Sequence, residues 1–65
     1  MDYRNLALLE GVARLGKDAT ARQIAEVVNL PQATAYRRIA DLENLGMVVR
    51  VGRIYRIGPR LYKLF

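Results

Sequence analysis

Residues 20–58 read TARQIAEVVNLPQATAYRRIADLENLGMVVRVGRIYRIG, and this stretch decides the fold. Thr20 and Gln23 have the spacing of a capping box, in which each side chain satisfies a backbone N–H of the other residue, so a helix is expected to follow Thr20. Asn29 tolerates the left-handed conformation that ends a helix, and Pro31 suits the first turn of the next one. The order of these helix start and stop signals predicts two short helices joined by a tight turn.

A hairpin is expected directly after the second of these helices. Gly46 ends that helix, and two β-rich runs, 47–51 and 54–57, flank the turn signal Gly52-Arg53. Two helices in tight succession followed by a basic β-ribbon are typical of a winged helix-turn-helix. We therefore predict a mainly α fold with a small antiparallel β-hairpin.

Apolar periodicity predicts a preceding helix and the core. A helix from Tyr3 to Leu15 is expected, with Asp2 as its N-cap and Gly16 as its stop, and Gly11 within it marks a close helix contact. The side chains expected to face inward are Leu6, Leu9 and Ala13 with Leu8, Val12 and Leu15 beside them; Ile24, Val27 and Val28; Ala35, Ile39, Leu42 and Leu45; and Val48, Tyr55 and Ile57.

Length and composition exclude most other classes of protein. The chain has 65 residues, about half of them apolar, so one small domain is expected. It contains no Cys and no His, which excludes disulfides, thiolate nucleophiles, imidazole bases and the usual zinc sites. No apolar run has the length of a membrane span and no signal-like segment follows Met1, so a soluble, cytoplasmic protein is expected.

The positive charge is concentrated in the last third of the chain. Residues 1–43 contain six basic and six acidic side chains, whereas residues 44–65 contain five basic and no acidic ones, which gives the whole net charge of +5. A one-sided basic segment indicates a polyanionic partner, either nucleic acid or an anionic membrane surface. A basic surface that serves only solubility is the alternative for the charge taken alone.

The domain is predicted to occupy residues 1–58. Residues 59–65 are expected to begin a linker or dimerisation helix, because Pro59 suits a helix start and Leu61, Leu64 and Phe65 have the spacing of an apolar face. The chain is either a fragment of a longer regulator or a natural stand-alone protein, and the sequence does not separate these.

The segments LPQATAYRRIADLENLGMVVR and YRIGPRLYKL resemble the N-terminal DNA-binding domain of the IclR family of transcription regulators. The matching positions are Leu30-Pro31, Thr34, Arg37, Leu42, Gly46 and Tyr55-Arg56-Ile57-Gly58. The resemblance covers nearly the whole chain, and the YRIGPRL ending is its most specific element. It implies a winged helix-turn-helix that binds double-stranded DNA at a palindromic operator, as a homodimer.

The chain departs from the family pattern in three respects. Arg38 stands where the family usually has an apolar residue, and Ala33 replaces a common serine that would be a hydrogen-bond donor. Family members normally continue into a larger domain that binds a small-molecule effector, and 65 residues do not include one. We therefore expect no effector site, no cofactor and no metal in this chain.

The helix at residues 31–45 is the predicted recognition helix, and the hairpin at 47–57 is the predicted wing. Arg37 is expected to bind guanine or phosphate, Gln32 to bind adenine, and the wing arginines to contact phosphates or the minor groove. Arg38 has the alternative of laying its stem along apolar surface, and Arg56 of pairing with Asp41 or Glu43. The predicted DNA-binding residues are Arg22, Gln32, Thr34, Tyr36, Arg37, Arg38, Arg50, Arg53 and Arg56.

The leading hypothesis is sequence-specific binding of duplex DNA by a transcriptional regulator. The main alternative is a winged-helix module that binds protein and has no specific affinity for DNA. A membrane-surface peptide is less consistent with the sequence because the basic segment is a hairpin, not a long amphipathic helix. An enzyme is not expected, since no nucleophile has a base partner and no pair of carboxylates suits acid–base catalysis.

Overall fold

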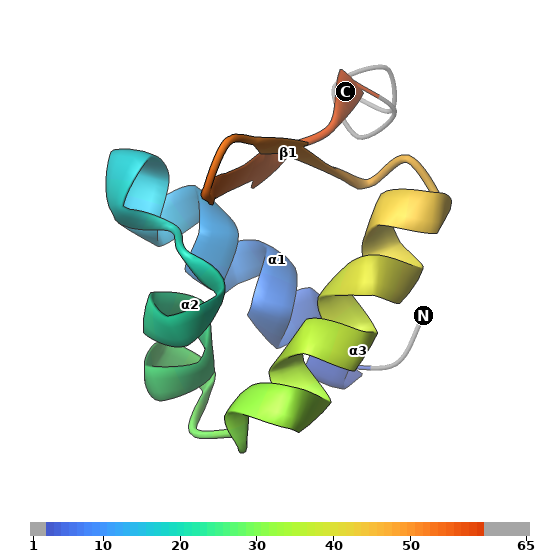
Figure 1. Cartoon of the computed structure of the whole chain (residues 1–65). Helices are drawn as coiled ribbons and strands as arrows, with labels where there is room; N and C mark the ends of the chain where they lie inside the picture. Colours follow the sequence, from blue (N-terminus) through green and yellow to red (C-terminus); the bar gives the residue numbers. More distant parts are fainter. Residues whose placement is uncertain (1–2, 60–65) are drawn as a thin grey trace.

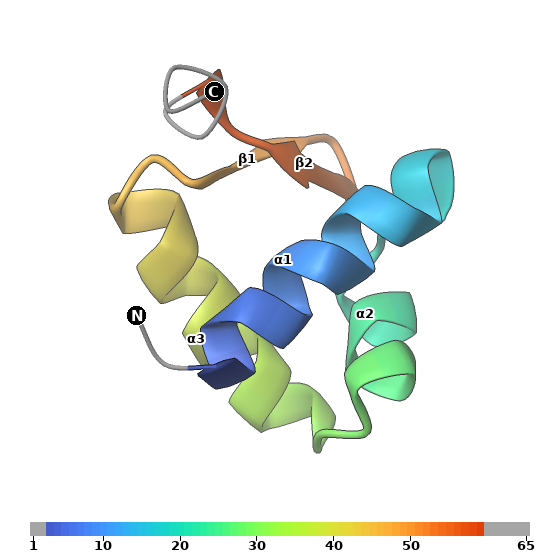
Figure 2. The same cartoon turned by 180° about the vertical axis from the view of Figure 1, so that it is seen from behind.

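The computed structural model describes residues 3–59, which form three helices followed by a hairpin (Figures 1 and 2). The elements are α1 (Tyr3–Leu15), a 3-10 turn η1 (Gly16–Asp18), α2 (Ala21–Val28), α3 (Gln32–Asn44), β1 (Val48–Val51) and β2 (Ile54–Ile57). The helices pack around a common centre, and the antiparallel hairpin covers one end of the group. This confirms the predicted winged helix-turn-helix.

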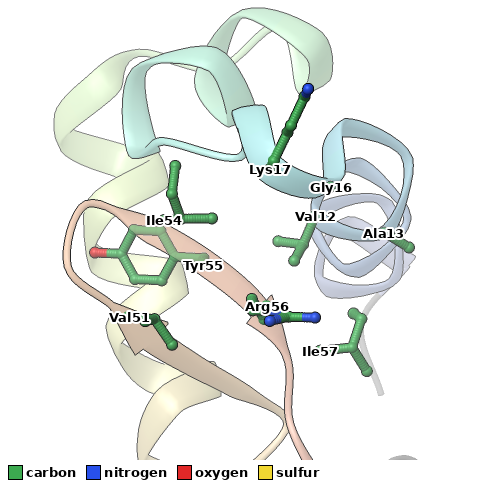
Figure 3. Close-up of a pocket in the computed structure, with 9 residues that line it drawn as sticks. All are labelled: Val12, Ala13, Gly16, Lys17, Val51, Ile54, Tyr55, Arg56 and Ile57. Carbon is green, nitrogen blue, oxygen red and sulfur yellow. The ribbon is translucent and has the colours of Figure 1, made fainter.

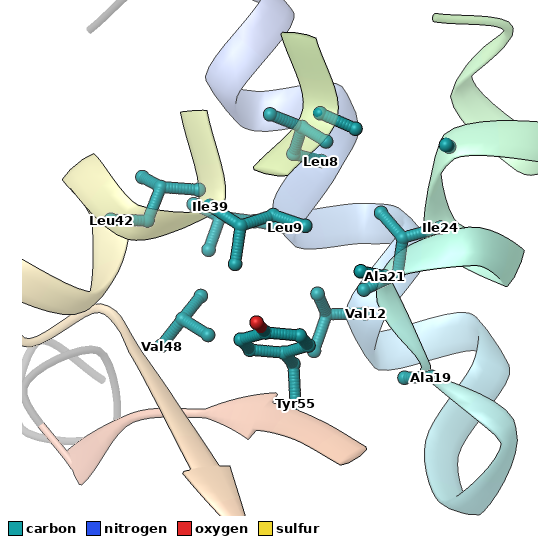
Figure 4. Packing of buried hydrophobic residues seen from close by; sticks show 12 residues of the cluster. Leu8, Leu9, Val12, Ala19, Ala21, Ile24, Ile39, Leu42, Val48 and Tyr55 are labelled. Atoms are coloured by element: carbon teal, nitrogen blue, oxygen red, sulfur yellow. The ribbon is translucent and has the colours of Figure 1, made fainter. Parts of the chain in front are cut away.

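All three helices and the hairpin contribute to one apolar core (Figure 4). The side chains of Leu8, Ile24, Ile39 and Leu42 are completely buried at its centre. The ring of Tyr55 lies between Val48 and Val12 and connects the hairpin to the helices. The hairpin is therefore part of the hydrophobic core and not a free appendage.

The buried stripe of α1 is rotated relative to the sequence prediction. Leu8, Leu9 and Val12 are buried, whereas Leu6 is 52% exposed and Ala13 is exposed. The predictions that Leu6 and Ala13 face inward were therefore wrong, whereas that for Leu9 is confirmed, and Leu8 and Val12, expected beside the stripe, complete the inner face. Both stripes have helical spacing, and only the position of α2 and the hairpin on one side of α1 selects between them.

Gly11 lies where α1 and α2 are in contact, as predicted. It is buried, and a Cβ atom at this position would lie 3.5 Å from Cγ1 of Val28. Helix α1 ends at Leu15, and Gly16 has a φ of +56°, which also agrees with its expected role as a stop signal.

The cap of α2 is half of a capping box. The backbone N–H of Gln23 donates to Oγ1 of Thr20 at 3.2 Å, as predicted. The backbone N–H of Thr20 donates instead to the carbonyl oxygen of Asp18 at 2.8 Å, so it needs no bond from the Gln23 side chain. The preceding 3-10 turn thus supplies the acceptor that the sequence pattern assigned to Gln23.

The turn between α2 and α3 is fixed by backbone hydrogen bonds. Asn29 has φ +56° and ψ +48°, and its N–H donates to Glu26 while that of Leu30 donates to Ala25, the Schellman pattern of helix termination. Pro31 is the N-cap of α3, one position earlier than the first turn we predicted, and Leu30 packs against the core. This arrangement sets the direction in which α3 leaves the turn.

Two apolar side chains at helix edges are more exposed than predicted. Val27 and Leu45 are each 47% exposed, and the inner face of α2 is completed by Ala21 and Ala25. At about 100° per residue, both side chains lie roughly a quarter turn or more from the centre of their helix's buried stripe. The predictions that Val27 and Leu45 are buried were therefore wrong.

The hairpin pairs Val48 with Ile57, Val49 with Arg56, Arg50 with Tyr55 and Val51 with Ile54. Gly52 has a φ of +65° and Arg53 has no positive φ, which is the sign pattern of a type II′ turn. Because side chains alternate along a strand, Val48, Tyr55 and Ile57 share the side of the hairpin that faces the core. This confirms the expected inward residues of the wing.

The hairpin is held by a backbone hydrogen bond to the segment before α2 and by a close backbone approach to the segment after α3. The N–H of Tyr55 donates to the carbonyl oxygen of Ala19 at 2.9 Å, so Ala19 lies along the edge of β2 without forming a strand. The N–H of Gly58 donates to Met47 at 2.8 Å, and a Cβ atom at Gly58 would overlap the carbonyl oxygen of Gly46. Only glycine allows the end of the wing to approach the end of α3 this closely.

The N-cap expected at Asp2 and most of the helix expected at 59–65 lie outside the described residues. None of the helices in residues 3–59 is long and apolar enough to cross a membrane.

Candidate nucleic-acid interface

The exposed face of α3 is centred on Arg37. Ala33, Arg37, Ala40 and Asn44 recur at helical spacing and are all exposed, on the side away from the buried Ala35, Ile39 and Leu42. The small side chains of Ala33 and Ala40 leave the guanidinium of Arg37 without a bulky neighbour along the stripe. The helix can therefore approach a flat or grooved partner closely at this point.

Charge is distributed unevenly along α3. Its N-terminal half contains Arg37 and Arg38 and no acidic residue, whereas its C-terminal half contains Asp41 and Glu43. A polyanion is attracted to the first half and repelled by the second, even though the whole helix has no net charge. The N-terminal half is therefore the part of α3 suited to contact DNA.

The other predicted residues of α3 lie on its two flanks. Gln32 and Tyr36 are exposed on one flank, and the Tyr36 side chain is 50% exposed. Thr34 and Arg38 are half-buried on the other flank. Thr34 was predicted to bind DNA, and its half-buried position leaves its hydroxyl less accessible than the side chains of Gln32 and Tyr36.

Arg22 lies in the first turn of α2 and is exposed. Its Nε atom lies 3.8 Å from Oε1 of Glu26, one turn along the same helix, and both side chains are mostly exposed. Pairs of this kind contribute little to stability because water screens them and two long side chains must be ordered. A phosphate could therefore replace Glu26 as the partner of Arg22 at little cost.

The three wing arginines point in different directions. Arg53 lies in the turn, and all three are exposed. Arg50 shares the side of the hairpin with Tyr55, whereas Arg56 shares the opposite side with Val49 and Val51. One flat surface cannot contact Arg50 and Arg56 equally. The structure therefore separates the wing arginines, which were predicted to make the same kind of contact.

The predicted DNA-binding residues at the start of α3 and those at the tip of the wing lie at opposite ends of the molecule. In both views the first turn of α3 lies at the end farthest from the hairpin, and the turn between β1 and β2 lies beside η1 (Figures 1 and 2). The domain measures 30 × 25 × 19 Å. An interface that includes both groups must extend along most of its length.

Arg56 does not form the alternative ion pair considered for it. Within residues 3–59 it pairs with neither Asp41 nor Glu43. It lines a groove between β2 and the end of α1, together with Lys17 of η1. Nothing in the local sequence marks Lys17, because the groove joins segments about forty residues apart.

The described part of the chain contains no cluster of three or more acidic, His or Cys side chains that could hold a metal ion. The exposed guanidinium, amide and hydroxyl groups of α3 and the hairpin are of the types that contact phosphates and base edges in protein–DNA interfaces.

A family model supports this interpretation. The model described as the IclR helix-turn-helix domain matches residues 4–52, from the start of α1 to the turn of the hairpin. The YRIG segment that resembled the family most specifically lies beyond the matched residues. No curated protein sequence matches the chain closely enough to add a second comparison.

Proposed function

The chain belongs to the IclR helix-turn-helix domain family of DNA-binding transcription regulators, and from this premise we propose that it binds duplex DNA in a sequence-specific manner. In this proposal α3 enters the major groove and the wing contacts the phosphate backbone or the minor groove. The observation that supports it most is the exposed position of Arg37 in the half of α3 that has no acidic residue. Along the exposed stripe of the helix, Arg37 lies between Ala33 and Ala40.

Sequence recognition is assigned to the start of α3. The fork of Arg37 matches O6 and N7 of guanine, and the amide of Gln32 matches N6 and N7 of adenine. Tyr36 donates to a phosphate oxygen and sets the position of the helix, with Thr34 and Arg38 as partners at the edge of the contact. An α-helix fits the width of the major groove, which brings Arg37 and Gln32 within reach of base edges.

The wing and α2 are assigned contacts that do not depend on sequence. Arg53 projects from the hairpin turn, Arg50 extends from one side of the wing, and Arg22 lies at the start of α2. Arginine binds phosphate through two parallel hydrogen bonds, and it also enters a narrow minor groove. With a length of 30 Å, the domain can contact DNA over nearly one helical turn, which is about 34 Å.

We also propose that two copies of the domain bind a palindromic operator. One short recognition helix contacts only a few base pairs, and a second copy related by twofold symmetry doubles that number. Membership of this family supports the arrangement. The spacing of the two half-sites in the selected DNA would give the distance between the two copies of α3.

Selection of bound fragments from a pool of random duplexes tests the proposal. We expect the pool to converge on one motif with two inverted half-sites, and fluorescence anisotropy to show much tighter binding to it than to a scrambled duplex. A pool that does not converge, with binding that depends on salt alone, would contradict sequence-specific recognition.

A protein-binding winged helix is the second candidate, because the wing exposes valines beside its arginines. Val51 is 60% exposed and Val49 is 37% exposed, more apolar surface than a contact with phosphates requires. Failure to bind any duplex even at low salt would favour this candidate over the first.

A further inference from the structure

A groove separates the wing from the C-terminal end of α1 (Figure 3). Val12, Ala13, Gly16 and Lys17 form one wall, and Val51 with residues 54–57 forms the other. Its volume is about 510 Å³, within the range of pockets that hold small organic ligands. The walls come from elements that the core already fixes, so the groove is formed before any ligand binds.

The lining of the groove is mainly apolar. Val12, Val51, Ile54 and Ile57 contribute aliphatic side chains, and Val51 is 60% exposed. A flat apolar molecule placed here would remove this surface from water, and that removal is the main source of affinity for small ligands.

The charged side chains that line the groove are both positive. Arg56 extends into the space between β2 and α1, whereas the Lys17 side chain starts from η1 at the rim and points away from Arg56, and no acidic residue lines the groove. Neither cation forms an ion pair with any side chain in residues 3–59. A ligand with a negative group therefore gains a partner without breaking an existing one.

We propose that this groove binds a small amphipathic anion, with a flat apolar body and one carboxylate. The apolar body lies against Val51, Ile54 and Ile57, and the carboxylate accepts two parallel hydrogen bonds from the guanidinium of Arg56. Lys17 adds a more distant positive charge, because its side chain points away from Arg56. The inference goes beyond DNA binding, and it revises the expectation that the chain has no small-molecule site.

The test compares two probes with the same apolar body and opposite charge. The ¹⁵N-labelled protein, without DNA, is titrated with 2-naphthoate and, separately, with 2-naphthylmethylammonium. We expect 2-naphthoate to shift the amide signals of residues 12–17 and 51–57 with a dissociation constant of about 1 mM, the affinity usual for a ligand of this size. The ammonium probe should bind at least about tenfold more weakly, because the guanidinium of Arg56 repels it.

Two matched pairs of variants locate the site. Arg56→Gln should weaken 2-naphthoate binding about tenfold, whereas Arg50→Gln, which removes the same charge from the other side of the wing, should leave it within about twofold. Val51→Thr should weaken it about two- to fourfold, and Val49→Thr, on the same strand but outside the groove, should not. All four side chains are exposed, and an unchanged pattern of the remaining amide signals verifies the fold of each variant.

Three results would overturn the inference. They are equal shifts from both probes, absence of shifts at about 10 mM 2-naphthoate, and equal effects of Arg56→Gln and Arg50→Gln. Shifts of the groove amides that depend on protein concentration before any probe is added would show that a second copy occupies the groove, which also contradicts it. None of these results depends on DNA binding, so they leave the proposed function untouched.

Discussion

Helix α3 and the hairpin differ in charge and in the way they are anchored. Helix α3 contains two arginines and two carboxylates and inserts Ala35, Ile39 and Leu42 fully into the core. The hairpin from Val48 to Ile57 contains three arginines and no acidic residue, and it is held by Val48, Tyr55 and two backbone contacts.

Under the proposed function, this difference separates two contributions to DNA binding. A rigid helix without net charge gains little from general attraction to phosphates, so its affinity must come from specific contacts. A basic hairpin attracts any duplex, because contacts to phosphate depend little on base sequence. We therefore propose that α3 supplies specificity and that the wing supplies affinity for DNA in general.

The largest expected effect concerns the anchoring of α3. Leu42→Ala removes a fully buried side chain and should lower the free energy of unfolding by about 2–5 kcal/mol. Leu45→Ala, three residues later and 47% exposed, should lower it by less than about 1 kcal/mol. Urea denaturation followed by circular dichroism measures both. Equal losses would contradict the burial that the structure assigns to the two leucines.

The next effect concerns specific contacts. Arg37→Ala should weaken binding to the selected duplex by about 1–3 kcal/mol, because one bidentate contact to a base is lost. Arg14→Ala, which removes an exposed arginine from α1, is the matched control and should have a much smaller effect. Fluorescence anisotropy with the selected duplex measures both variants. An unchanged affinity for Arg37→Ala would exclude α3 as the recognition helix.

The attachment of the wing is tested by Gly58→Ala. The new Cβ atom would overlap the carbonyl oxygen of Gly46, which is backbone and cannot move aside, so we expect a loss of about 1–3 kcal/mol in stability. Gly11→Ala is the control, since its Cβ atom would lie 3.5 Å from Val28, an ordinary contact, and alanine favours a helix. Thermal unfolding should show a lower midpoint for the first variant only, and a stable Gly58→Ala protein would disprove the close approach.

The smallest expected effect concerns the attraction of the wing to phosphates of any duplex. Arg53→Ala should weaken selected and scrambled duplexes alike, by about 1 kcal/mol or less, and reduce the slope of log affinity against log salt by about 1. Titrations at several salt concentrations measure the slope. A loss confined to the selected duplex would assign Arg53 to sequence recognition and remove the contrast between wing and helix.

The elements of the fold could be predicted from the sequence because their signals are local. Thr20 with Gln23, Asn29, Gly46 and the Gly52-Arg53 turn act on backbone within a few residues, and each ends or begins an element where expected. The exposed position of Arg37 follows from helical periodicity around Ala35, Ile39 and Leu42 in the same way.

The rest depends on tertiary contacts that no local pattern contains. The inner stripe of α1 was misplaced, and Val27 and Leu45 proved exposed, because only the packing of the other elements selects which side of a helix is covered. The groove beside Lys17 likewise exists only once β2 lies along the end of α1.

The division of roles between α3 and the wing is tested most directly by one ratio. This is the dissociation constant for a scrambled duplex divided by that for the selected duplex, measured by anisotropy for the unchanged protein, Arg37→Ala and Arg53→Ala. We predict that Arg37→Ala lowers the ratio about tenfold or more, and that Arg53→Ala leaves it within about twofold while weakening both duplexes. An unchanged ratio for Arg37→Ala, or an equal fall for Arg53→Ala, would contradict the account.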